Sequence, residues 1–206
     1  VPAFPFRQVV GAILYLYVWC VPEIGFAISQ IARNCNRPQK RDVRALQNLA
    51  RYLYTRKSVG ITYVNGGREG LEAYVKRSSS KAPEPADDRF KTNVHAYVDA
   101  DYAEGDTVTR RSTSGWAIMY GGAAVAWGCT RQPTCAQSSM ESELGALRDV
   151  SAEVVAVRMN LALLNPAMNM RATTVYCDNE AAIQIVRGHG KLAARKHIAV
   201  RAMLCR

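Results

Sequence analysis

The sequence lacks the patterns that define several common classes of protein. Its six cysteines include no C-x-x-C pair and no other zinc-type spacing, and several stand in apolar, strand-like runs. We therefore expect buried thiols in a reducing, intracellular compartment. The apolar run over 9–21 is too short for a membrane span and is followed by Pro22 and Glu23, which favours a core helix and no membrane partner.

Acidic residues are also few. The 206 residues carry 27 Lys and Arg against 17 Asp and Glu, which gives a net charge of +10 and a pI near 9.5. Residues 1–64 hold nine of the basic side chains and only two of the acidic ones, so this segment alone contributes +7. A basic segment of this size favours a polyanionic partner, and nucleic acid is the commonest.

Three helices are predicted at the start of the chain. The apolar run over 9–18 forms the first, Pro22 suits the first turn of the second, and Pro38 opens the third. The apolar face of the third helix is made of Val43, Leu46, Leu49, Ala50 and Leu53. Its opposite face is basic, and is either simply solvated or follows nucleic-acid phosphates. The basic residues on this face are Arg41, Arg44 and Arg51.

A hairpin and a linker are predicted after these helices. Residues 61–76 read as two strands around the turn Asn65-Gly66-Gly67. The next segment is polar and rich in serine and proline, which is typical of a linker. We therefore predict a helical domain with its hairpin over 1–75, a linker over 76–91 and a second domain over 92–206.

The second domain has the element order of an α/β sheet. Strands are predicted over 94–99, 115–120, 123–127 and 173–177. Gly121-Gly122 forms a tight turn between the second and third strands, and a long helix begins at the capping box of Ser138 and Glu141. A short helix follows over 179–187. This order predicts an antiparallel meander of the first three strands, with the fourth strand parallel to the first.

Three acidic residues stand where these elements begin or end. Asp99 ends the first strand, Asp178 follows the fourth, and Glu143 lies one turn into the long helix. Acids at the carboxyl ends of strands lie at the functional edge of an open α/β sheet. Converging carboxylates repel one another unless cations neutralise them, and oxygen ligands suit Mg²⁺ or Mn²⁺. Two such ions can assist phosphodiester hydrolysis, although a single Asp at a strand end is more often a helix cap or a surface acid.

Several short stretches occur in one order along the chain. In the second domain they are Asp99-Ala-Asp-Tyr-Ala, Arg111-Ser-Thr-Ser-Gly-Trp, Gln132-Pro-Thr, Ser138-Ser-Met-Glu-Ser-Glu-Leu-Gly-Ala-Leu, Tyr176-Cys-Asp-Asn-Glu-Ala-Ala-Ile and Arg195-Lys-His-Ile. Together they resemble the ribonuclease H domain of copia-type retroelement polyproteins. Upstream, three stretches resemble the end of that family's reverse transcriptase, near its thumb. They are Phe6-Arg-Gln-Val-Val-Gly-Ala-Ile-Leu-Tyr-Leu, Pro22-Glu-Ile-Gly-Phe-Ala and Ala50-Arg-Tyr-Leu.

The resemblance implies a ribonuclease H-like mixed sheet preceded by a small, helical, thumb-like region. It also implies hydrolysis of RNA in an RNA–DNA hybrid with two Mg²⁺ or Mn²⁺ ions. Asp99, Glu143 and Asp178 match the metal ligands, and Asp101 is an alternative because it shares a strand face with Asp99. Further nucleic-acid contacts are expected at Arg110, Arg111, Ser112, Thr113, Lys196 and His197, although the first four also fit a plain polar turn.

The sequence departs from the family pattern at three points. Ala199 stands where the family usually has an Asp, and the Tyr-x-Asp-Asp motif of the polymerase is absent. The family's fifth strand and last helix, with a fourth carboxylate, are expected after the segment around Lys196 and are missing from the 206 residues. Two functions therefore stay open, a ribonuclease H and a non-catalytic structural or RNA-binding subunit of a ribonucleoprotein, and a decayed sequence with no role fits the same departures. In the second, other protein chains would cover the open sheet edge.

Overall fold

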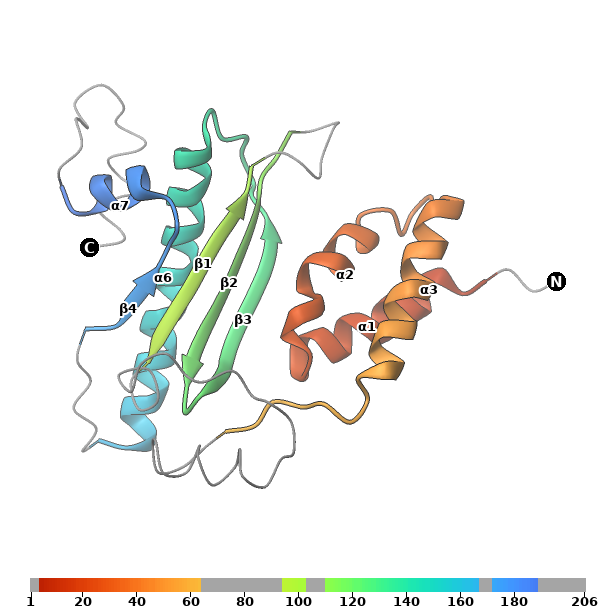
Figure 1. Cartoon of the computed structure of the whole chain (residues 1–206), viewed down its shortest axis with the longest axis horizontal. Coiled ribbons are helices and arrows are strands. Elements are labelled where there is room, and N and C mark those ends of the chain that lie inside the picture. Colours follow the sequence, from red (N-terminus) through yellow and green to blue (C-terminus); the bar gives the residue numbers. More distant parts are fainter. Residues whose placement is uncertain (1–3, 64–93, 103–109, 167–171, 189–206) are drawn as a thin grey trace. The chain divides into compact units, whose positions relative to one another are not determined.

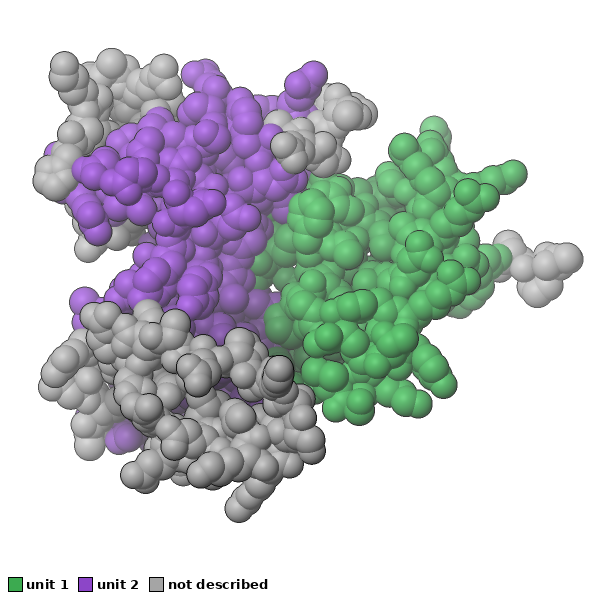
Figure 2. All heavy atoms as spheres, viewed as in Figure 1, with its two compact units in different colours: residues 1–61, 128–130 green, residues 62–127, 131–206 purple. Residues whose placement is uncertain are grey.

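The computed structural model describes residues 4–63, 94–102, 110–166 and 172–188. The chain divides into two compact units, residues 1–61 with 128–130 and residues 62–127 with 131–206 (Figure 2). Residues 61–63 are not in a strand, so the prediction that the first strand of the hairpin begins at residue 61 is wrong. Instead, the hydroxyl of Tyr63 donates a hydrogen bond to the carbonyl of Ala124 at 2.8 Å. The rest of the predicted hairpin and the linker over 76–91 lie outside the described residues.

The first unit is helical, as predicted. Helix α1 covers Phe6–Trp19, a 3-10 turn over Pro22–Ile24 leads into α2 at Gly25–Ala32, and α3 covers Lys40–Thr55 (Figure 1). Pro22 occupies the first turn, where its missing N–H costs nothing. The helices enclose one apolar core, whose buried residues are Phe6, Val10, Ile13, Ile24, Ile28, Ile31, Leu46 and Leu49.

Helix α3 differs from its prediction at two points. Ala50 is exposed, because the buried stripe of this helix runs through Leu46 and Leu49 and continues at Leu53. Pro38 precedes the helix, which begins after Gln39. The buried carboxylate of Asp42 accepts hydrogen bonds from the backbone N–H of Gln39 at 2.8 Å and from Asn34 Nδ2 at 2.9 Å. An acidic residue therefore fixes the start of the most basic helix, as the dipole of a helix N-terminus favours.

The second unit contains a mixed sheet with the strand order β3-β2-β1-β4. The strands cover His95–Asp101 (β1), Thr113–Tyr120 (β2), Ala123–Arg131 (β3) and Thr174–Tyr176 (β4). Strand β1 pairs antiparallel with β2 and parallel with β4, and β2 runs opposite to β3 (Figure 1). The predicted meander and parallel fourth strand are confirmed. Strand β1 extends to Asp101, so the prediction that Asp99 ends it is wrong.

Two helices accompany the sheet. Helix α6 covers Ser139–Leu164 and lies along one face, against β1 and β2, and α7 covers Glu180–Val186 and packs on α6 (Figure 1). Strand β1 alternates accordingly, with Ala96, Val98 and Ala100 buried in the core beneath α6. As predicted, Ser138 caps α6, since its Oγ accepts a hydrogen bond from the N–H of Glu141. Among the described helices none is long and apolar enough to cross a membrane.

Candidate functional site

Glu143 joins helix α6 to strand β1. Its side chain is 5 % exposed, and its Oε1 accepts a hydrogen bond from the backbone N–H of Ala100 at 3.1 Å. Strand β4 pairs with β1 only as far as Tyr97, so the backbone beyond that point needs another acceptor. Glu143 supplies it. The contact holds one carboxylate oxygen in place and leaves Oε2 for other partners.

The chain that follows β4 brings two more polar groups to Glu143. Cys177 Sγ lies 3.7 Å from Glu143 Oε2, and one ligand atom from each of Glu143, Cys177 and Asp178 lies within 4.8 Å of the other two. Glu143 is buried, Cys177 is half-buried and Asp178 is exposed, so the group opens to solvent on one side. Asn179 then caps α7 by accepting a hydrogen bond from the N–H of Ala182 at 3.0 Å, which fixes the turn after Asp178.

The environment of this group disfavours negative charge. Burial raises the pKa of Glu143 to about 7, the hydrogen bond from Ala100 opposes this shift, and the charges of Asp99 and Asp178 add to it. Burial also raises the pKa of Cys177 to about 11, and the neighbouring carboxylates contribute. A cation among these side chains would remove the repulsion and favour the ionised form of Glu143.

Asp99 and Asp101 stand on β1, beside the group. Asp99 pairs with Gly115 across the sheet and is exposed, whereas Asp101 pairs with Thr113 and is half-buried. The charge of Asp99 acts on Glu143, but Asp99 does not belong to the group of converging ligand atoms. Of the three predicted metal ligands, the structure therefore brings Glu143 and Asp178 together and leaves Asp99 nearby.

The predicted basic face of α3 is open to solvent. Arg41, Arg44 and Arg51 are all exposed. Arg51 Nη1 donates a hydrogen bond to Asn48 Oδ1 at 3.1 Å, and the guanidinium of Arg41 lies 3.9 Å from the carboxylate of Asp42. Neither contact removes the guanidinium from water. These side chains lie in the first unit, whereas the acidic group lies in the second.

The sequence did not reveal that aromatic rings continue this basic face. The guanidinium of Arg56 lies 5.6 Å from the centre of the Tyr52 ring, and the ammonium of Lys57 lies 4.7 Å from that of Tyr54. Both tyrosines are exposed. Rings and cations in alternation provide stacking surfaces as well as charge. A basic helix that ends in Tyr-x-Tyr was the available signal.

The turn before β2 divides into exposed and buried residues. Arg110 is exposed, with a positive φ of 52°, and Arg111 is half-buried. The side chain of Ser112 is fully buried and that of Thr113 is 3 % exposed. Burial keeps Ser112 and Thr113 from contacting a phosphate backbone, so only the two arginines are available for that role. Lys196 and His197 lie outside the described residues.

Comparisons with known proteins connect the chain to mobile elements. It is 27 % identical over 197 residues to the Retrovirus-related Pol polyprotein from transposon TNT 1-94 of Nicotiana tabacum, a match that covers 96 % of this chain. It is 33 % identical over 149 residues to the Uncharacterized mitochondrial protein AtMg00810 of Arabidopsis thaliana, covering 72 % of this chain and 52 % of that protein. It is 30 % identical over 151 residues to Secreted RxLR effector protein 161 of Plasmopara viticola, covering 73 % of this chain and 89 % of the effector.

The chain belongs to the copia-type family of retroelement Pol polyproteins. It spans 13 % of the length of the TNT 1-94 polyprotein, so it corresponds to a small part of such a protein. No protein-family model matches it. No solved structure matches it either. The family therefore establishes an origin in the polymerase region of a retroelement.

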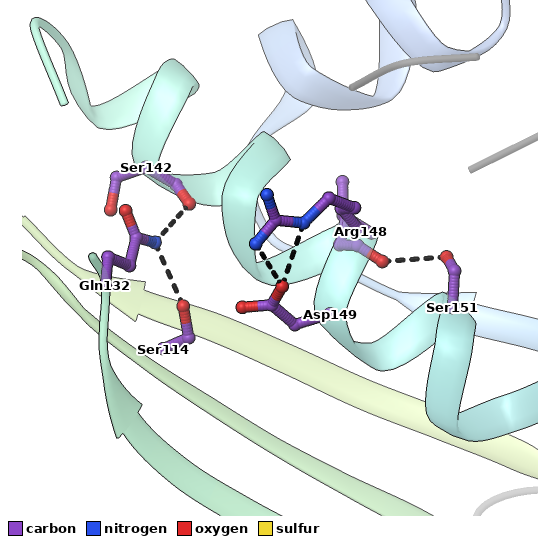
Figure 3. A network of polar contacts seen from close by, with 7 residues as sticks. Ser114, Gln132, Ser142, Arg148, Asp149 and Ser151 are labelled. Carbon is purple, nitrogen blue, oxygen red and sulfur yellow. Dashed lines mark hydrogen bonds and ion pairs between the residues drawn. The ribbon is translucent and has the colours of Figure 1, made fainter. Parts of the chain in front are cut away.

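A buried glutamine anchors α6 of this retroelement chain beside Glu143. Gln132 Nε2 donates hydrogen bonds to Ser114 Oγ at 2.9 Å and to the carbonyl of Ser142 at 2.8 Å (Figure 3). A side chain on Gly145 would come within 3.1 Å of the same nitrogen, so the glycine makes room for the amide. The contacts tie the end of β3 to β2 and to the residue before Glu143. Sequence reasoning noticed Gln132-Pro-Thr only as a resemblance and missed this role.

A second polar contact in the same region involves an acid on α6. Arg148 Nε donates a hydrogen bond to Asp149 Oδ1 at 2.9 Å (Figure 3). This ion pair joins two consecutive residues of one helix. Glu143, in contrast, contacts strand β1 through the N–H of Ala100.

Proposed function

We propose that this retroelement chain carries a ribonuclease H-like site that hydrolyses the RNA strand of an RNA–DNA hybrid. Mg²⁺ or Mn²⁺ would be held by Glu143 and Asp178, with Asp99 as the third carboxylate and Asp101 as its alternative. One observation carries the proposal. Glu143 of α6 and Asp178, at the carboxyl end of β4, converge beside a parallel pair of strands. This is the edge at which open α/β sheets bind their ligands.

The donor set fits divalent cations. Carboxylate oxygens are the ligands that Mg²⁺ and Mn²⁺ prefer. Burial is the main reason that the pKa of Glu143 is raised to about 7, and the charges of Asp99 and Asp178 add to it. A bound cation would favour the ionised carboxylate against both effects. Asp99 is one residue from Ala100, whose N–H binds Glu143, so its exposed carboxylate lies on the adjacent part of the same strand.

Each residue would have a separate part in the reaction. Ala100 orients Glu143, because its N–H fixes Oε1 and leaves Oε2 on the side of Cys177, the residue before Asp178. Asp178 is exposed and would face the scissile phosphate. Gln132 would fix the position of α6 relative to the sheet through its hydrogen bonds to Ser114 Oγ and the Ser142 carbonyl. When bound, two divalent ions supply an activated water and neutralise the charge on the leaving oxygen.

The basic face of α3 supports a nucleic-acid partner. Arg41, Arg44 and Arg51 would neutralise backbone phosphates, and Tyr52 and Tyr54 would offer stacking surfaces. This face does not depend on the acidic group. It therefore also favours the second candidate, a non-catalytic RNA-binding subunit of a ribonucleoprotein that binds structured RNA without cutting it.

Cleavage of a labelled RNA–DNA hybrid in Mn²⁺ distinguishes the two candidates. The nuclease proposal predicts that wild type cuts the RNA strand and that Asp178→Asn loses at least about 100-fold in rate, since it removes a metal ligand. Glu153→Gln is the control, because it removes one exposed charge from α6. Binding of the hybrid without cleavage by wild type would support the RNA-binding candidate and contradict the nuclease.

A further inference from the structure

Cys177 is the one member of the acidic group that the proposed nuclease does not use. Its thiol lies 3.7 Å from Glu143 Oε2 and shares the group with Asp178. Magnesium and manganese select oxygen ligands, so a sulfur atom contributes little to binding them. Zinc and similar cations bind thiolate and carboxylate together. The mixed donor set therefore points to a second class of ion.

The geometry suits such an ion without rearrangement. In tetrahedral zinc sites the metal lies about 2.3 Å from sulfur and about 2.0–2.2 Å from carboxylate oxygen, so sulfur and oxygen are about 3.6 Å apart. Glu143 Oε2 and Cys177 Sγ already lie 3.7 Å apart. The ligand atoms of all three residues lie within 4.8 Å of one another. One ion can thus touch all three after small rotations of side chains.

We propose that Glu143, Cys177 and Asp178 bind one thiophilic divalent cation of the zinc class. The inference rests on the proposed function in placing a cation at these residues, and it adds the class of ion that competes there. Three protein ligands leave a fourth position for water. As the ion bonds to Sγ, the S–H bond breaks and its proton passes to solvent. Where the Glu143 carboxyl is protonated, its proton leaves as well, and no oxidation state changes.

Occupancy by such an ion has a consequence for the nuclease. It engages Glu143 and Asp178, two of the three carboxylates that the proposed hydrolysis needs, and fills the space between them. A zinc-class ion is therefore an inhibitor of the Mg²⁺-dependent reaction. The half-buried thiol makes the inhibition selective, because a hard ion gains nothing from it.

Titration of the whole chain with Cd²⁺ tests the proposal through the thiolate-to-metal absorption band in the ultraviolet. Wild type and Cys135→Ser, which removes an exposed thiol outside the group, are expected to develop the band. Cys177→Ser is expected to lose it. Cys177→Ser should also lower the affinity for Cd²⁺ at least about 10-fold. Replacing a residue that merely hydrogen-bonds to a metal ligand already costs about 10-fold, and Cys177 would be a ligand itself. Its affinity for Mn²⁺ should not change.

Asp178→Asn provides a second variant, because Asp178 is exposed and its replacement leaves the core intact. It should lower the affinity for both Cd²⁺ and Mn²⁺. A band that survives in Cys177→Ser overturns the inference, and so does a wild type that binds Mn²⁺ but gives no band with Cd²⁺. In the second case the proposed function stands. A wild type that binds neither ion overturns both.

Discussion

The carboxylate of Glu143 accepts a hydrogen bond from the backbone N–H of Ala100, 3.1 Å away and 43 residues earlier in the chain. The bond connects the long helix to the central strand at the point where the parallel partner strand has ended. It therefore satisfies a buried backbone group and positions an acid at the edge of the sheet. Structure and proposed chemistry depend on the same side chain.

The pH dependence of stability should report this arrangement. The pKa of Glu143 is raised from 4.5 to about 7, so between these values the folded state binds a proton that the unfolded state has released. Stability is then lost as pH rises through about 7. Glu143→Gln should remove this loss. As pH rises from about 4 to about 8.5, the free energy of unfolding of the variant should increase relative to that of wild type by on the order of 3 kcal/mol. Metal-free denaturant unfolding at both pH values measures it.

Glu153→Gln is the control for this experiment. It removes an exposed carboxylate from the same helix, so its stability relative to wild type should be the same at both pH values. If Glu143→Gln behaves like Glu153→Gln, burial and the neighbouring charges do not raise the pKa of Glu143 as described above.

Gln132 should be essential for stability although it lies outside the acidic group. Gln132→Leu keeps the volume but removes two hydrogen bonds, to Ser114 Oγ and to the carbonyl of Ser142. The expected cost is about 1–3 kcal/mol, because a buried hydroxyl loses its partner. Gln137→Leu, at an exposed position five residues later, should cost less than about 0.5 kcal/mol. Equal effects in urea unfolding would contradict the anchoring role.

The stacked tyrosines should couple β1 to β4. Tyr97 and Tyr176 are direct partners in the parallel register, with ring centres 5.2 Å apart and planes at 25°. A double-mutant cycle with Tyr97→Ala and Tyr176→Ala should give a coupling free energy of about 0.5–1.5 kcal/mol. The matching cycle with phenylalanine keeps both rings and should give almost none. A coupling near zero in the alanine cycle would mean that β4 is held by its backbone alone.

Nucleic-acid binding should depend on the exposed arginines of α3. Changing Arg41, Arg44 and Arg51 to Gln should flatten the log–log salt dependence of affinity by about two to three units if all three contact phosphates. Arg148→Gln is a control, since this guanidinium already pairs with Asp149. Fluorescence anisotropy at several salt concentrations measures the slope. An unchanged slope in the triple variant would show that the basic face is only solvated.

Much of the second unit followed from local sequence signals. Gly121 and Gly122 both adopt positive φ, so the tight turn that begins the third strand was predictable. Ser138 caps the long helix because its hydroxyl is three residues before Glu141. The parallel fourth strand followed from the order of the elements, because the strand after a crossover helix usually lies parallel to an earlier strand of the sheet. The turn and the cap depend on neighbours in the chain, whereas the fourth strand depends on the order of the elements.

The errors and omissions depend on contacts between distant segments. Strand β1 continues to Asp101 because β2 pairs with it that far, which no property of Asp99 reveals. Gln132 is buried only because β3 ends beneath α6, and Cys177 becomes a possible ligand only when β4 lies beside Glu143. Ser112 and Thr113 were expected either to contact phosphates or to form a plain polar turn, and the fold buries both of them.

A manganese titration followed by thermal melting tests most directly whether Glu143 and Asp178 form one cation site. Wild type should gain about 5 °C or more in Tm at 100 times the Kd, because only the folded chain assembles the site. Asp178→Asn should melt near wild type without metal and gain almost nothing with it, whereas Glu153→Gln should respond like wild type. A wild-type Tm that does not change in millimolar Mn²⁺, or an equal increase in the Tm of Asp178→Asn, would contradict the site.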